Sequence, residues 1–493
     1  MPTFRLPPSL VRLSGLCLLL LVAYALRIAN IDTYSYWQDE AAQIDAAMAP
    51  TIPEVIQTVS RRGIGGVPLD HVLTWVVVRL AGDAEIVLRY LPLMWSLITV
   101  ALAFRLGDTL QPGVGKWSAL AMAFSPLAVA YAREARFYSL GLMLATAVIT
   151  AAALAARGRI RISTTAWLLC FGLATATAYA HIYSALLWGA GLAITLFGSS
   201  RSQRVQVTAW FTSTLACAGL AFLPWLVGAL NTTPHTLGGS SLGERQINAI
   251  LRGLELPPLI PLQRADWLAS LYPPIAGLLA LVGVLYGLKT HTHRWAVAGL
   301  TGACLFGVLG VIVANLAAHY FFAPRQFLFL TTIRAILIGF GLAGIEKIVS
   351  WLPKRRLAHL ILRYGLAGMF ILSAAHVSHL DLYAPSNSVA GPAVEFVLNN
   401  YNRDSQDIWL TGIVRFAVDF YVRRSGAPPI RWRTDATAET LKAARPHSLA
   451  VVELRATDTT TRLFEDAGFS RVWPPPGLFN RHDLVIYRKE ASR

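Results

Sequence analysis

Two adjacent carboxylates, Asp39 and Glu40, follow the first long apolar stretch of the chain and are the residues best suited to chemistry. Acidic groups close to a bilayer are costly and usually mark a site or a partner. A carboxylate near a surface of low dielectric constant can take a proton from a hydroxyl that attacks an electrophile, so both residues are candidate general bases. The alternative is a solvated pair, or the N-cap of a surface helix that begins at Ala41. Trp37 and two nearby tyrosines favour a platform for a sugar or for the membrane interface.

A second group of chemistry-bearing residues lies in the segment 131–139. Arg133 and Arg136 are three residues apart and are expected to share a helix face. Two guanidinium groups beside Tyr138 are suited to a lipid phosphate, because each can offer paired donors. The alternative is that these arginines lie at helix ends and extend their charges to the interface. Arg325 repeats the pattern of an arginine among aromatic residues and is a further candidate for the phosphate.

Other polar residues of interest are His181 and Tyr183, which occur at an expected tight turn between two helices. A lone histidine there is more often an interfacial hydrogen-bonding residue than a ligand. A divalent metal at Asp39 and Glu40 is chemically compatible with two carboxylates, but no His or Cys cluster supports a zinc site, and no metal is predicted. The four cysteines lie within apolar segments and are interpreted as small core residues.

The composition indicates which class of protein must position these groups. Of 493 residues, 55% are hydrophobic and only 14% are charged, whereas soluble proteins carry about 25% charged residues. The chain is therefore predicted to be a polytopic membrane protein. Its net charge of +16 does not indicate a nucleic-acid partner, because 28 of the 43 Lys and Arg residues belong to the apolar part, residues 1–380.

Eleven apolar segments are long enough to be predicted membrane spans. A shorter one, 69–80, is expected to dip into the membrane or lie on it. The first segment, Leu10–Ala29, is too long for a cleaved signal and is expected to start in the cytoplasm. The other predicted spans are 90–107, 117–131, 138–156, 164–180, 182–198, 207–230, 270–288, 295–317, 328–349 and 359–380.

The basic loops predict the orientation of these spans. Four loops rich in Lys and Arg, near residues 157–161, 201–204, 289–294 and 354–356, all fall on the side of the N-terminus. The positive-inside rule places that side in the cytoplasm. The outer face then receives the loop 31–68, the arginine-bearing turns and everything after residue 380.

From residue 381 the composition changes to short apolar runs alternating with amphipathic segments. The runs 407–410, 448–452 and 483–487 are expected to form strands, and 413–424, 436–444 and 459–467 are expected to form helices. The predicted architecture is a transmembrane domain, 1–380, with a catalytic loop at 31–68, followed by a soluble α/β domain, 381–493.

Several motifs together resemble the GT-C membrane glycosyltransferases. Within that fold they are most similar to the protein O-mannosyltransferase and lipid A aminoarabinose transferase group, also called dolichyl-phosphate-mannose-protein mannosyltransferase-like. The motifs are Trp-x-Asp-Glu-Ala at 37–41, Gly-Val-Pro-Leu-Asp-His at 66–71, Glu-Ile-Val-Leu-Arg-Tyr-Leu-Pro at 85–92, and Ser-Pro followed by Ala-Arg-Glu-Ala-Arg-Phe-Tyr-Ser-Leu within 125–140.

The resemblance implies a polyprenyl-phosphate sugar donor and inverting transfer on the outer face of the membrane. Asp39 would be the base, and Glu40 would orient it or the acceptor. The donor phosphate would be held by residues drawn from Arg133, Arg136, Tyr138 and Arg325. The sequence departs from the family at Val67-Pro68-Leu69-Asp70-His71, which leaves the roles of Asp70 and His71 open.

Two other functions compete with glycosyl transfer. A transporter or flippase for an anionic lipid would carry ionisable residues near the midplane and inverted repeats, whereas this chain gathers its polar residues on one predicted face. A glycan-binding membrane protein without catalysis is the third possibility. The Ala- and Arg-rich composition and the short loops favour a bacterial inner membrane with the site facing the periplasm.

Overall fold

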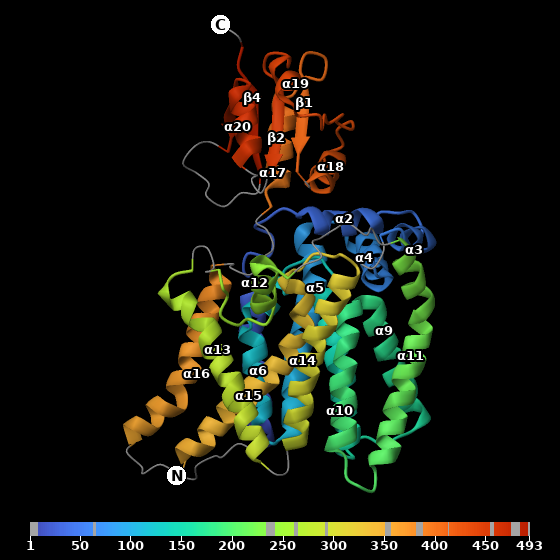
Figure 1. Ribbon diagram of the computed structural model, residues 1–493, viewed down its shortest axis with the longest axis vertical. Helices are drawn as coiled ribbons and strands as arrows, with labels where there is room; N and C mark the ends of the chain where they lie inside the picture. Colours follow the sequence, from blue (N-terminus) through green and yellow to red (C-terminus); the bar gives the residue numbers. More distant parts are fainter. Residues whose placement is uncertain are drawn as a thin grey trace. The chain divides into compact units, whose positions relative to one another are not determined.

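The computed structural model describes residues 8–62, 66–232, 242–260, 265–290, 294–350, 356–380, 388–412, 414–453, 458–474 and 484–491. The chain divides into two compact units (Figure 1). The first comprises Met1–Ala29, Ile52–Leu73 and Arg89–Ala384, and the second comprises Asn30–Thr51, Thr74–Leu88 and Pro385–Arg493. The second unit therefore joins part of the first loop to the C-terminal α/β segment.

The first unit is helical. It contains α1 (Pro8–Ile28), α3 (Ile52–Ser60), α6 (Val114–Phe124), α7 (Pro126–Ala132), α8 (Tyr138–Ala156), α9 (Thr164–Ala180), η2 (Ile182–Leu187), α10 (Trp188–Gly198), α11 (Arg204–Thr232), α12 (Glu244–Gly253), α13 (Trp267–Lys289), α14 (Arg294–Ala317), η3 (Pro324–Leu330), α15 (Thr331–Ser350) and α16 (Arg356–His379). Two further helices, α4 (Pro68–Ala81) and α5 (Glu85–Leu110), cross the division between the units.

Each of the eleven predicted spans contains helix. Among the described residues, six helical stretches are long and apolar enough to cross a membrane: Glu85–Leu110, Tyr138–Ala156, Arg204–Thr232, Trp267–Lys289, Arg294–Ala317 and Pro324–Val349. Shorter apolar helices occur at Leu13–Ile28 and Ile182–Gly198. The predicted span 117–131 is broken at Ser125, where Pro126 begins α7 and the Ser125 hydroxyl accepts a hydrogen bond from the Ala128 amide.

Small residues allow the helices of this unit to approach closely. On α13, a Cβ placed at Gly283 would lie 1.8 Å from the Leu337 carbonyl oxygen of α15. On α15, a Cβ at Gly341 would lie 2.1 Å from the Leu279 carbonyl oxygen. Such contacts are typical of helix pairs packed in membranes, where van der Waals packing replaces the hydrophobic effect.

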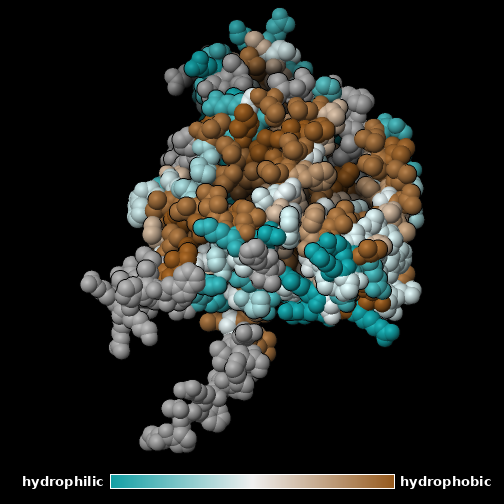
Figure 2. All heavy atoms as spheres, turned by 60° about the horizontal axis from the view of Figure 1, so that its bottom comes forward, coloured by the Kyte–Doolittle hydropathy of each residue, from teal (hydrophilic) through white to brown (hydrophobic). Residues whose placement is uncertain are grey.

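The outer surface of the molecule is rich in apolar side chains. Figure 2 shows broad hydrophobic areas (brown) interrupted by polar patches (teal). Large exposed side chains include Leu18, Leu220, Leu305 and Leu372, each more than 60% exposed on a helix of the first unit. Soluble proteins rarely expose contiguous apolar areas of this kind. The predicted polytopic helical class is confirmed.

The second unit contains the predicted α/β fold. A four-stranded sheet has the order β1-β2-β4-β3, with β1 (Ile408–Thr411) parallel to β2 (Leu449–Glu453), and with β4 (Leu484–Lys489) antiparallel to both β2 and β3 (Phe469–Trp473). The helices of the unit are α2 (Gln38–Ala47), α17 (Ala390–Asn400), α18 (Arg415–Arg424), α19 (Ala438–Lys442) and α20 (Asp458–Asp466). The three predicted strands and three predicted helices are confirmed with small boundary shifts, whereas β3 and α17 were not predicted.

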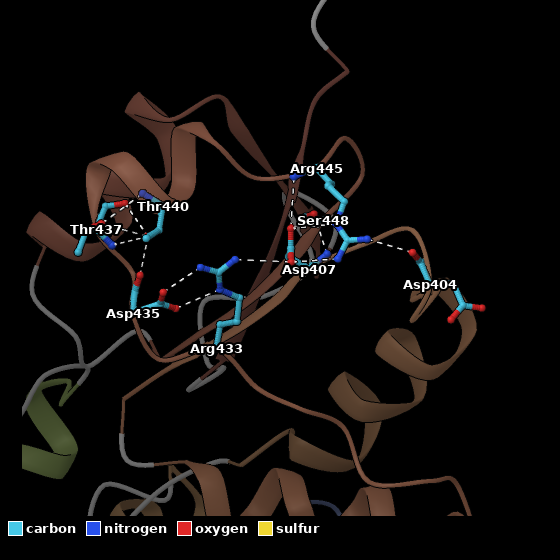
Figure 3. A network of polar contacts seen from close by, with 8 residues as sticks. All are labelled: Asp404, Asp407, Arg433, Asp435, Thr437, Thr440, Arg445 and Ser448. Atoms are coloured by element: carbon cyan, nitrogen blue, oxygen red, sulfur yellow. Dashed lines mark hydrogen bonds and ion pairs between the residues drawn. The ribbon is translucent and has the colours of Figure 1, made fainter.

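Ion pairs and hydrogen bonds between charged side chains connect the segment after α18 to the sheet, as Figure 3 shows. Asp407, beside β1, accepts hydrogen bonds from Arg445 and forms an ion pair with Arg433 at 3.6 Å. Arg433 also pairs with Asp435 at 2.8 Å. Partial burial raises the pKa of Asp407, but Arg445 and Arg433 more than offset it, so that pKa lies below its ordinary value. This network has a structural role, because it holds the segment that carries Arg433 beside β1, where Arg433 forms a backbone bridge with Trp409.

Candidate functional site

The two carboxylates of the first loop lie in the first turn of α2 and have different surroundings. The helix begins at Gln38, not at Ala41, so neither residue is an N-cap. Glu40 is only 1% exposed, and its carboxylate accepts a hydrogen bond from the Trp37 amide at 3.3 Å, so it caps the first turn of the helix. Asp39 is half-buried. Glu40 thus has a structural task in the first turn of α2.

The aromatic residues before these acids do not form an open platform. Tyr36 is fully buried and Trp37 is 8% exposed. The Tyr36 ring lies edge-on to Phe420 at 5.6 Å and stacks with Tyr421 at 6.4 Å. The expectation of a sugar or interfacial platform is therefore wrong for Tyr36, because Phe420 and Tyr421 of the C-terminal α/β segment cover its ring.

In the first unit, the arginine-bearing segment 133–137 is a turn between α7 and α8, not a helix. The expectation that Arg133 and Arg136 share a helix face is wrong, because α7 ends at Ala132 and α8 begins only at Tyr138. The Arg133 guanidinium donates to the Leu26 carbonyl in the last turn of α1. Arg136 instead lies over the rings of Phe137 at 4.7 Å and Tyr138 at 5.6 Å.

The structure brings Tyr138, His181 and Tyr183 together with Arg136. The His181 ring lies 5.6 Å from that of Tyr138 and 5.7 Å from that of Tyr183. Its Nδ1 atom is hydrogen-bonded to the Ser184 hydroxyl at 2.9 Å. Burial, with a smaller contribution from the charge of Arg136, lowers the pKa of His181 to about 3. This imidazole is therefore neutral at physiological pH.

Asp70 and His71 lie in the first turn of α4, and both are buried. The His71 Nδ1–H donates to the Val67 carbonyl at 2.8 Å, which fixes the neutral tautomer. Burial and the charges of Arg62 and Arg136 lower the pKa of His71 to about 3. The charge of Arg136 therefore acts on both histidines, which places His71 in the surroundings of the same cluster.

Arg325 belongs to η3 and lies over the Phe321 ring at 5.3 Å. Its segment is held by two amide side chains that the sequence did not single out. Gln326 accepts from the Asn315 side chain at 2.9 Å and from the Ala323 amide at 3.0 Å. Asn315 also accepts from the Tyr183 hydroxyl at 2.5 Å. Asn315 thus joins the segment that carries Arg325 to the aromatic cluster around Arg136.

An apolar cavity of about 380 Å³ adjoins this cluster. Tyr183 and Tyr320 contribute its polar edges. The remaining lining residues come from η2, α11, α14 and the segment just after α14: Ile182, Leu186, Leu226, Leu230, Gly310, Ala314, Ala317 and Ala318. A cationic, aromatic cluster next to an apolar cavity suits an amphipathic ligand with an anionic head.

A buried ion pair that is not apparent from the sequence lies at the start of α7. Glu255 is fully buried and forms an ion pair with Arg334 of α15. Its carboxylate also accepts from the Ser125 hydroxyl at 3.1 Å and from the Leu127 amide at 2.8 Å. Its backbone φ of 50° lies in the left-handed region, which is uncommon for a residue with a side chain. Glu255 therefore fixes the start of the helix that leads to Arg133.

Within the described parts of the chain, no three His, Cys, Asp or Glu residues gather as metal ligands would. The predicted site residues instead form two sets. Asp39, Glu40 and Trp37 belong to the second unit, whereas the arginines, Asp70, His71 and the cluster around His181 belong to the first.

No protein-family model and no curated protein sequence matches this chain. Solved structures do match. ArnT from Cupriavidus metallidurans in the apo state is 13% identical, with a TM-score of 0.55 over 98% of this chain and 100% of ArnT. ArnT bound to undecaprenyl phosphate is 12% identical, with a TM-score of 0.54 over 97% and 98%. Archaeal oligosaccharyltransferase AglB from Archaeoglobus fulgidus, in complex with an inhibitory peptide and a dolichol-phosphate, is 10% identical, with a TM-score of 0.54 over 96% and 74%.

These proteins are GT-C glycosyltransferases. The similarity extends over nearly the whole chain, so the resemblance carried by the motifs is confirmed at the level of the fold.

Proposed function

Because the chain has the GT-C fold, we propose that it is an inverting glycosyltransferase. The enzyme moves a sugar from a polyprenyl-phosphate donor to a hydroxyl of a glycolipid, glycan or protein. One observation carries the proposal: a cation among aromatic rings adjoins an apolar cavity in a fold shared with an ArnT that is bound to undecaprenyl phosphate.

The donor phosphate is assigned to Arg136 and Tyr138, with Arg325 as a second cation. Arg136 lies within 3.5 Å of the Tyr138 hydroxyl, so both can contribute donors to the same anion. Asn315 links the segment of Arg325 to this cluster, because it donates to the Gln326 side chain and accepts from the Tyr183 hydroxyl. Arg133 is a weaker candidate, because its guanidinium donates to a carbonyl of α1. The apolar cavity beside Tyr183 accepts part of the polyprenyl chain.

His71 and His181 act as neutral groups in this scheme. Their pKa values of about 3 keep both imidazoles uncharged, so neither adds a cation to the phosphate site. Each can orient a substrate hydroxyl through the ring nitrogen that its protein partner leaves available. We assign Asp70 and Tyr183 to the same cluster as residues that contact the substrate.

The reaction is a single displacement. An acceptor oxygen attacks the anomeric carbon, the bond from that carbon to the phosphate oxygen breaks, and the configuration inverts. Asp39 takes the proton from the acceptor hydroxyl as the new bond forms. The departing phosphate gains negative charge, and arginines already oriented toward it stabilise that charge without reorganisation. Glu40 maintains the helix turn from which Asp39 projects, because it caps that turn.

We place the reaction on the outer face of a bacterial inner membrane. The support is that the four basic loops are all expected on one side of the membrane, and the positive-inside rule assigns that side to the cytoplasm. Single cysteines introduced at exposed Asp32 and at exposed Arg201 test this orientation. A membrane-impermeant maleimide added to intact cells should label position 32 and leave position 201 unlabelled; the reverse pattern would place the loop in the cytoplasm.

The function is tested with purified protein in nanodiscs that contain labelled polyprenyl-phosphate sugars and a membrane extract as acceptor. Release of polyprenyl phosphate is the expected result. Arg136→Ala should weaken binding of the donor, whereas exposed Arg245→Ala serves as the matched control. If donor lipid crosses liposomes without losing its sugar, the protein is a transporter or flippase instead. If the donor binds but is neither consumed nor moved, the protein is a glycan-binding protein without catalysis.

A further inference from the structure

The short helix that carries Asp39 depends on partners distant in sequence. Helix α2 has ten residues, and isolated helices shorter than about 12–15 residues are marginal in water. Within its own segment, the first turn of α2 is capped by the Glu40 carboxylate, which accepts from the Trp37 amide. The packing that supports it comes from α18 of the C-terminal segment, within the same compact unit.

The chain just before Asp39 is fixed by a hydroxyl of α18. The Tyr36 amide donates to the Tyr421 hydroxyl at 2.7 Å, and the Tyr421 hydroxyl donates to the Glu85 carboxylate at 2.6 Å. Arg424 pairs with the same carboxylate at 2.9 Å. At its other end, Tyr36 donates its own hydroxyl to the Asp83 carbonyl at 3.0 Å. Tyr36 is thus held both by its backbone and by its side chain.

Two further contacts bind α2 itself to α18. The Gln38 side-chain oxygen accepts from the Phe416 amide at 3.0 Å and from the Ala417 amide at 3.4 Å, so it caps the first turn of α18. In the last turns of both helices, Arg423 pairs with Asp45 at 2.6 Å. These contacts lie on both sides of Asp39 along the chain, and they restrict its helix at two points.

We infer that the C-terminal domain positions the catalytic base, and that Tyr421 is a positioning residue acting through the Tyr36 amide. The inference rests on the proposed function, in which Asp39 is the base. The C-terminal domain is then part of the catalytic apparatus in addition to any contact it makes with the acceptor.

The chemistry of the contact requires a hydroxyl. Tyr421 accepts one hydrogen bond and donates another, which a phenol can do and a phenyl ring cannot. Burial, and then the hydrogen bond to Glu85, raise the pKa of Tyr421, so the phenol keeps its proton at every physiological pH. Tyr421→Phe keeps the ring stacking on Tyr36 but leaves the Tyr36 amide without this acceptor.

The first test measures turnover by full-length Tyr421→Phe in nanodiscs. The variant loses the hydrogen bonds to the Tyr36 amide and to Glu85, and loss of the first should lower kcat by about tenfold, the order expected for one hydrogen bond. The KM for the polyprenyl-phosphate donor should stay unchanged, because the donor is assigned to the first unit. Tyr487→Phe is the matched control, since Tyr487 is also buried in the same domain and donates only to Glu465 at 3.4 Å. A Tyr421→Phe enzyme with the kcat of wild type would overturn the inference.

The second test is amide hydrogen exchange, which needs no activity. In Tyr421→Phe, the amides of residues 36–45 should exchange about tenfold faster, while those of β4 should exchange as in wild type. Faster exchange in a protein that transfers no sugar would support the positioning contact and refute the proposed function. Unchanged exchange in a protein that does transfer sugar would refute the contact and leave the proposed function intact. Equally faster exchange throughout the C-terminal domain would show a role in folding only and would also overturn the inference.

Discussion

Neutralising Glu255 should destabilise the helical unit strongly, and its surroundings indicate by how much. The Glu255 side chain is fully buried and that of its partner Arg334 is 11% exposed, so water can compensate little for a lost charge. Breaking a buried ion pair by removing one partner costs about 3–5 kcal/mol. Glu255→Gln can still accept from the Leu127 amide, so we expect the lower end, about 3 kcal/mol, or roughly a hundredfold in the unfolding constant.

The assay is unfolding of the purified protein in mixed micelles with increasing SDS, followed by tryptophan fluorescence. Arg334→Met should also destabilise, because it leaves the Glu255 charge buried without this partner. The double variant should regain most of the loss, since removing both charges removes the penalty. Exposed Glu244→Gln on α12 is the control and should unfold as wild type does. If the two single effects simply add in the double variant, the reasoning about the buried pair is refuted.

Three further predictions concern the phosphate cluster, the buried histidine and the helix packing. Arg136→Lys should raise the donor KM less than Arg136→Ala does, because lysine keeps the charge but loses the paired donors; equal KM values for Lys, Ala and wild type would exclude a phosphate contact. His181 has a folded-state pKa of about 3, below its ordinary value of about 6.5, so its contribution to stability is present above pH 6.5 and is lost as the pH falls toward 3. Unfolding measured from pH 7 to 4 should show a smaller loss in His181→Gln than in wild type, and parallel curves would contradict the shift. Gly283→Val should prevent α13 from packing on α15 and abolish the monodisperse peak in size-exclusion chromatography. Gly302→Ala is the control and should elute as wild type does, because a Cβ at Gly302 meets nothing within 4 Å. A normal elution profile of Gly283→Val would refute the close approach of the two helices.

The features that the sequence predicted correctly are those with a long or repeated signal. Each apolar run of span length contains helix, although the run 117–131 is divided into α6 and α7, and short apolar runs predicted three of the four strands. The strand β3 was missed because Phe469–Trp473 carries the polar residues Ser470 and Arg471 and pairs only with β4 at the edge of the sheet. Its identity as a strand depends on a partner that local pattern does not reveal.

The errors at the candidate site have the same origin. The spacing of Arg133 and Arg136 suggested a helix face, but that spacing carries no information on where a helix ends. Trp37 and the tyrosines before it suggested a sugar or interfacial platform, but the Tyr421 ring that stacks on Tyr36 is 385 residues away in the sequence. Glu255 and Arg334 could not be paired from the sequence because they lie in separate segments, and only the folded chain brings them together.

The most direct test of the central claim is the turnover of Asp39→Asn with a polyprenyl-phosphate sugar as donor. Loss of a general base lowers kcat by about 10²–10⁴-fold, and the variant should bind the donor as tightly as wild type does. Asp32→Asn, an exposed carboxylate of the same loop, should retain full turnover. Release of polyprenyl phosphate by Asp39→Asn at the wild-type rate would contradict the account, because no base would then be needed at Asp39.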